Sequence, residues 1–157
     1  MPRRIIPIKL PRGWAKKPHR DELHGIARRI KMQFIARKKR LQVNPLNDSH
    51  SSSTSLTHTL RMNRLRREQH ISIMRVAAKI GFTAAGIMSG KQRQAIRKIL
   101  LDNYSLVYGF TRIDRQSVFS KMLNKLNKVE GLESGAKRQF LDRFMQSLIQ
   151  LRSEITA

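Results

Sequence analysis

The side chains with the most evident chemistry in this sequence are cations, and they are densest at its beginning. The first twenty residues, MPRRIIPIKLPRGWAKKPHR, hold seven Lys or Arg, four Pro, no acid and the only Trp of the chain. Basic side chains bind phosphate groups, and an indole ring stacks on an unpaired base. Because Pro7, Pro11 and Pro18 oppose a helix, this segment predicts an extended arm that binds nucleic acid. Packing of Trp14 on the protein's own core is the alternative use of that ring.

We expect the cations of this arm, of a basic helix after it and of the start of a second helix to contact nucleic acid. The predicted nucleic-acid-binding residues are Arg3, Arg4, Lys9, Arg12, Trp14, Lys16, Lys17, Arg20, Arg28, Arg29, Lys31, Arg37, Lys38, Lys39, Arg40, Arg61, Arg64, Arg66 and Arg67. Solvation explains many charge runs on helices, and it is all that we expect for Lys137 and Arg138. It does not explain residues 1–45, where prolines, isoleucines and a Trp lie between the charges.

The overall charge indicates a polyanionic partner. The 157 residues include 33 Lys or Arg and 10 Asp or Glu, which gives a net charge of +23. Each phosphate that a cation neutralises releases counterions, so nucleic acid is the best complement. An anionic membrane surface is the weaker alternative, and no run approaches the roughly 18 apolar residues of a membrane span.

The absence of Cys excludes disulfides and thiolate metal sites. It suits a reducing compartment such as the cytoplasm, a mitochondrion or a plastid. An Arg-rich, acid-poor N-terminus is also typical of organellar transit peptides. Those peptides form amphipathic helices, which four prolines oppose, so we favour an uncleaved binding arm and keep a cleaved presequence as the alternative.

The charge falls along the chain while the apolar periodicity rises. The net charge is +12 over residues 1–45, +8 over 46–99 and +3 over 100–157. This layout predicts an N-terminal part that binds nucleic acid and a C-terminal part that folds on its own. We expect an extended basic arm at 1–20, a basic amphipathic helix at 21–41, a flexible linker at 42–56 and a helical bundle domain at 57–157.

Apolar residues recur at three- and four-residue steps, which is the helical period. In the first helix the stripe consists of Leu23, Ile26, Ala27, Ile30 and Phe34. The other helices are expected over Thr59–Ile80, from Ser89 to Gly109, over Thr111–Val129 and after Ser134. No long stretch alternates with the period of a strand. The predicted fold class is therefore all-α, a small bundle of about four helices preceded by the arm and one basic amphipathic helix.

The segment VAAKIGFTAAGIMSG has the residue spacing of a helix-turn-helix, with the turn at Gly81 and a reading helix from Thr83. The exposed positions of that reading helix hold no Arg, Asn, Gln or Lys, which base readout needs, and Gly86 interrupts it. A close-packed helical corner is therefore the preferred interpretation. Base readout and contact with a nucleic-acid backbone remain alternatives.

The histidines and acids do not form a convincing catalytic or metal-binding pattern. In HRDELH, His19 and Glu22 could share a helical face, but a capped and solvated first turn accounts for this stretch. His50, His58 and His70 are isolated, and the chain has neither G-x-S-x-G nor a Gly-rich phosphate loop. We expect no catalytic residue, no metal and no cofactor.

A proline-containing basic arm, a basic helix and a small helical domain are together similar to the composition of ribosomal proteins as a class. We predict a structural RNA-binding protein, not an enzyme, within a large ribonucleoprotein such as a ribosome or an organellar ribosome. Its expected partners are nucleic acid, with RNA favoured and DNA as the alternative, and other proteins of the assembly, but no membrane. The competing hypotheses are a DNA-binding helix-turn-helix regulator and a viral coat or packaging protein that wraps nucleic acid.

Overall fold

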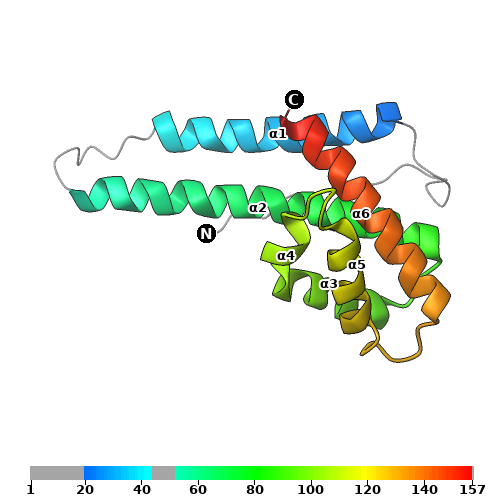
Figure 1. Ribbon diagram of the computed structural model, residues 1–157. Helices are drawn as coiled ribbons and strands as arrows, with labels where there is room; N and C mark the ends of the chain where they lie inside the picture. Colours follow the sequence, from blue (N-terminus) through cyan, green and yellow to red (C-terminus); the bar gives the residue numbers. More distant parts are fainter. Residues whose placement is uncertain (1–19, 44–51, 157) are drawn as a thin grey trace.

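The computed structural model describes residues 20–43 and 52–156, and these residues fold almost entirely into helices (Figure 1). In chain order the helices are α1 (Arg20–Val43), α2 (Ser52–Ala85), α3 (Gly90–Asp102), α4 (Tyr104–Tyr108), α5 (Arg115–Leu126) and α6 (Ser134–Thr156). The described residues include no strand, which confirms the predicted all-α class.

The centre of the fold is the contact between the two long helices α2 and α6. Three fully buried rings form its core: Phe140 stacks on Phe82 at 4.8 Å between centroids and on Phe144 at 5.8 Å. The short helices complete the bundle, with α5 against α6 and α3 against α2 and α5. Burial of large apolar side chains from several helices in one cluster supplies the main stabilisation of such a bundle.

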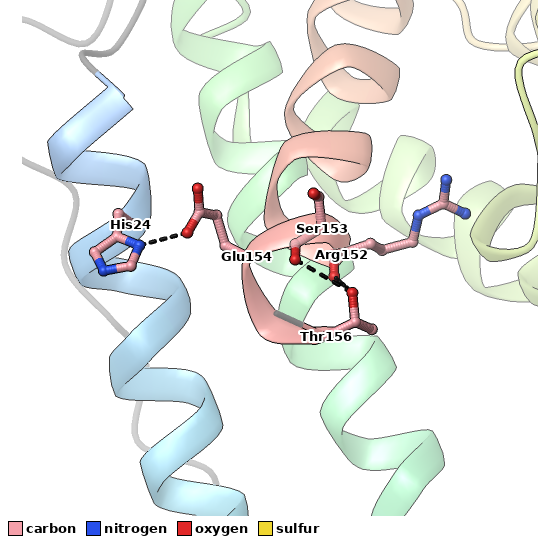
Figure 2. A network of polar contacts seen from close by, with 5 residues as sticks. All are labelled: His24, Arg152, Ser153, Glu154 and Thr156. Atoms are coloured by element: carbon pink, nitrogen blue, oxygen red, sulfur yellow. Dashed lines mark hydrogen bonds and ion pairs between the residues drawn. The ribbon is translucent and has the colours of Figure 1, made fainter.

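Helix α1 packs on both α2 and α6 through its apolar stripe. All five residues of the predicted stripe are buried, and they belong to the same hydrophobic cluster as the residues of the bundle. His24 of α1 pairs with Glu154 of α6 on the exposed side of this contact (Figure 2). The cations of α1 are therefore carried by a helix that is fixed to the bundle.

The predicted linker at 42–56 is wrong at both of its ends. Helix α1 continues through Val43 and α2 begins at Ser52, while residues 44–51 lie outside the described part of the chain. A helix that is held by tertiary packing extends at little further cost, so a Ser- and Thr-rich stretch can form its first turns. The same reasoning explains why α2 ends at Ala85 rather than at Ile80.

The helix-turn-helix alternative places a turn at Gly81, and that placement is wrong. Helix α2 runs through Gly81, and the chain turns later, at Gly86, where φ is +68°. A β-carbon at Gly81 would lie 2.8 Å from the Phe140 ring and 2.9 Å from the Phe140 carbonyl oxygen. Glycine is needed here because α2 and α6 approach closely, and not because the backbone must bend.

The helix expected from Ser89 to Gly109 is divided at Asn103. Ser89 is its N-cap, since the hydroxyl accepts a hydrogen bond from the Gln92 amide at 3.4 Å. At the other end of α3, the Asn103 side chain donates to the Ile99 carbonyl at 2.7 Å. Asparagine side chains that bond to nearby backbone compete with the helix in this way, so α4 starts as a separate short helix.

Candidate nucleic-acid interface

Helices α1 and α2 lie side by side and antiparallel, and together they extend away from the short helices α3–α5 (Figure 1). Arg37 of α1 pairs with Glu68 of α2 at 2.5 Å and links the two helices there. We call residues 35–41 of α1 and 56–68 of α2 the paired end. Its surface includes Leu56 and Leu60, which are about three-fifths exposed, at 62% and 60%.

The paired end brings together many cations and almost no acid. It holds eight cations and one carboxylate, that of Glu68. The cations are Arg37, Lys38, Lys39, Arg40, Arg61, Arg64, Arg66 and Arg67. All of them except Arg37 are exposed, and each belongs to the set predicted from the sequence. An exposed surface of this kind can bind several phosphates at once.

The other predicted residues are placed only in part. Arg28 and Arg29 are exposed and Lys31 is half-buried, all on the first half of α1. The predicted contacts of the arm, from Arg3 to Lys17 and including Trp14, lie outside the described residues. Arg20 is the first residue of α1, and its side chain also lies outside them.

One charged residue was misjudged from the sequence. The Lys137 side chain is buried, at 8% exposure, and is not a solvated charge. Its ammonium group reaches the Asn127 side-chain oxygen at 3.5 Å, while its aliphatic stem packs within the bundle. Arg138, its neighbour, is exposed as expected.

The sequence analysis missed a second group of cations where α2 meets α3. We call Arg75, Lys79, Arg93 and Arg97 the corner cluster. Arg93 and Arg97 each hold their guanidinium carbon 5.3 Å from the centre of the Phe82 ring. Burial, followed by the charges of the cluster's three arginines, lowers the pKa of Lys79. The four-residue spacing within each helix is visible in the sequence, but their meeting across the turn at Gly86 is not.

A histidine of α2 packs against two tyrosines of α4. The His70 ring stacks on Tyr108 at 3.8 Å between centroids, and its Nδ1 is hydrogen-bonded to the Tyr104 hydroxyl. Burial and then the charge of Arg66 lower the pKa of His70. Burial raises the pKa of Tyr108 to about 12. These rings therefore stay uncharged at neutral pH and act in packing.

Arg152 of α6 fixes the end of α4. Its guanidinium donates to the carbonyl of Tyr108 and, at 3.0 Å, to the carbonyl of Phe110. Figure 2 shows this side chain pointing away from the contact between His24 and Glu154. In the described residues, no three His, Asp or Glu side chains are grouped so that they could hold a metal ion.

Comparison of the chain with protein-family models, with curated proteins and with solved structures finds no match. None of the helices in the described ranges has the length and apolarity that crossing a membrane requires.

Proposed function

We propose that this chain is a structural nucleic-acid-binding protein that binds RNA within a large ribonucleoprotein. The observation that supports this proposal is the paired end, with eight cations and one acid on two helices. Helix α1 contributes its apolar stripe to the hydrophobic cluster and α2 contributes residues from Leu65 onward, so the charges are carried by helices that are anchored to the bundle. Cations spread over two helices suit many phosphate contacts better than base readout by a single helix. Recognition of folded RNA depends mainly on shape and phosphate contacts.

A DNA-reading helix-turn-helix has less support. Its defining turn would fall at Gly81, which lies inside α2 against Phe140. A packaging protein that wraps nucleic acid would use the same cations, so the test must separate it from an RNA-binding component of a particle.

The first experiment compares the salt dependence of RNA binding between two variants of the full chain. One variant changes Arg61, Arg64, Arg66 and Arg67 to Gln. The matched control changes four exposed cations outside the interface, Arg112, Lys121, Lys128 and Arg138, to Gln. Both variants lose the same charge. Only the first should reduce the slope of log K against log salt, by about 3, because each phosphate contact contributes about 0.7–0.9.

Equal losses in the two variants would contradict the proposed interface, because net charge alone would then explain binding. Deletion of residues 1–20 tests the arm in the same assay, and we expect weaker binding by a folded protein. Trp14→Ala should cost about 1–3 kcal/mol of binding free energy if the indole stacks on a base. Full affinity without residues 1–20 would exclude the arm from the interface.

The second experiment separates the classes of assembly. Folded or partly single-stranded RNA should outcompete duplex DNA of equal length, and selection from random duplexes should enrich no sequence. Enrichment of one palindrome, with a preference of about 1,000-fold or more, would favour the DNA-binding regulator. Sedimentation of the native protein in a large particle would agree with the proposal, whereas a filament would favour packaging.

A further inference from the structure

The corner cluster draws its four cations from two helices to one region. Arg75 and Lys79 are four residues apart on α2, and Phe82 follows Lys79 by three, so all three lie along one stripe of that helix. Arg93 and Arg97 are likewise four residues apart on α3 and both lie over the Phe82 ring. Arg75 is exposed and the other three cations are half-buried.

The two guanidinium groups of α3 are held in place before any ligand binds. The Phe82 ring is fully buried and Phe140 covers one of its faces, with an interplanar angle of 18°. The guanidinium carbons of Arg93 and Arg97 each lie 5.3 Å from the centre of this ring. The Nε–H of Arg93 also donates to the Ile87 carbonyl at 2.6 Å. A guanidinium that is already ordered loses little conformational entropy on binding a ligand.

The charge of this cluster is not compensated by the protein. Within the described residues, none of its four cations forms an ion pair with a carboxylate. Burial is the main cause that lowers the pKa of Lys79 and of Arg97, and the neighbouring arginines add to it. Like charges gathered in a partly buried place destabilise the fold, and such arrangements are typical of sites that bind the opposite charge.

We propose that the corner cluster is a second phosphate-binding site, separate from the paired end, and that it holds a backbone phosphate of the bound nucleic acid. Guanidinium groups donate two parallel hydrogen bonds to phosphate oxygens, and Lys79 adds a point charge. Arg67 of the paired end and Arg75 are eight residues apart, about 12 Å along α2, so one strand can contact both sites. That the bound phosphate belongs to a nucleic acid rests on the proposed function, whereas the existence of the anion site does not.

The anion site is tested without nucleic acid, by thermal unfolding of the full chain in inorganic pyrophosphate and in chloride of equal ionic strength. Pyrophosphate should raise the Tm of the wild type more than chloride does. The double variant Arg93→Gln/Arg97→Gln should lose the part of this difference that the corner cluster contributes, while any part from the paired end remains. The control Lys91→Gln/Lys98→Gln removes two exposed cations from the same helix and should keep it. A difference that is as large in the cluster variant as in the control, or that is absent from the wild type, would overturn the site.

Lys79→Gln gives a second readout that does not depend on Phe82 or Ile87. This substitution removes one of four mutually repelling charges, so it should raise the Tm at low salt without anion and reduce the pyrophosphate effect. A lysine with a purely structural role would lower the Tm instead, and that result would count against the site.

RNA binding then tests whether the phosphate at this site belongs to a nucleic acid. The Arg93→Gln/Arg97→Gln variant should reduce the salt slope of RNA binding by about 1–2, with the paired end unchanged. A normal pyrophosphate effect together with an unchanged RNA slope would overturn the assignment to nucleic acid. Failure of the paired-end variants to affect RNA binding would refute the proposed function, while the pyrophosphate result would still decide the anion site.

Discussion

The closest approach between α2 and α6 gives the sharpest test of the fold. Alanine is the better helix former, yet we expect Gly81→Ala to destabilise the protein. Its β-carbon would lie 2.8 and 2.9 Å from two atoms of the Phe140 ring and 2.9 Å from the Phe140 carbonyl oxygen. The ring cannot move aside, because it stacks on both Phe82 and Phe144 and is fully buried. The two helices must therefore separate.

The magnitude follows from two opposing effects. Overpacking of a core costs about 1–3 kcal/mol, and the higher helix propensity of alanine offsets up to about 1 kcal/mol. A backbone oxygen is among the contacts, so relief is difficult and we expect a net loss of about 1–2 kcal/mol. Gly25→Ala in α1 is the matched control, because nothing lies within 4 Å of its β-carbon. That substitution should stabilise the protein by about 0.5–1 kcal/mol.

The assay is urea unfolding of the full chain, followed by far-ultraviolet circular dichroism. The two variants should lie on opposite sides of the wild type, separated by about 1.5–3 kcal/mol. Phe140→Leu in the Gly81→Ala background should cost less than it does alone, because it removes part of the clash. Stabilisation by Gly81→Ala would refute the close packing of α6 on α2. If the effects of Gly81→Ala and Phe140→Leu on the free energy of unfolding are additive, the destabilisation by Gly81→Ala does not come from the Phe140 ring.

Three further outcomes follow from the core and its polar contacts. Phe140→Ala should lower the free energy of unfolding by about 3–5 kcal/mol in urea titrations; Phe119→Ala should cost clearly less, because Phe119 is only half-buried. Burial, aided by a nearby arginine, lowers the pKa of His70 below its usual 6.5, so the unfolded chain binds a proton that the folded chain does not. Stability measured in urea at a series of pH values should therefore fall as the pH drops below about 6.5, and His70→Gln should weaken that dependence. Arg152→Lys should cost about 1.5–3 kcal/mol in the same assay, because one ammonium nitrogen replaces the two guanidinium nitrogens that reach the carbonyls of Tyr108 and Phe110, and Arg143→Lys should change little.

The sequence predicts best where apolar periodicity is strong. The stripe of α1 is buried as expected, and α6 begins at Ser134 and buries Phe140, Phe144, Leu148 and Leu151. In such segments the spacing of the apolar residues that share one face identifies the segment as a helix. The eight cations of the paired end were also predicted, because charge density along the chain is visible without a structure.

Other features depend on contacts between distant residues, which one sequence does not display. The length of α2 reflects support from α1 and α6 rather than the propensity of its first residues. Gly81 has the spacing of a turn glycine, but its role is set by Phe140, a residue of another helix. The corner cluster depends on how the chain turns between Gly86 and Ser89, and a change in that turn would direct Arg93 and Arg97 elsewhere.

The position of α6 against both α1 and α2 also bears on when the protein can fold during its synthesis. His24 and Glu154, which join α1 to α6, are 130 residues apart in the sequence. At elongation rates of about 5–20 residues per second, α1 is made on the order of ten seconds before its partner helix. During that interval its apolar stripe has no α6 to cover it, while its cations are already able to bind. Under the proposed function, a nascent chain of this kind would engage nucleic acid before its core closes, and assembly would then precede folding.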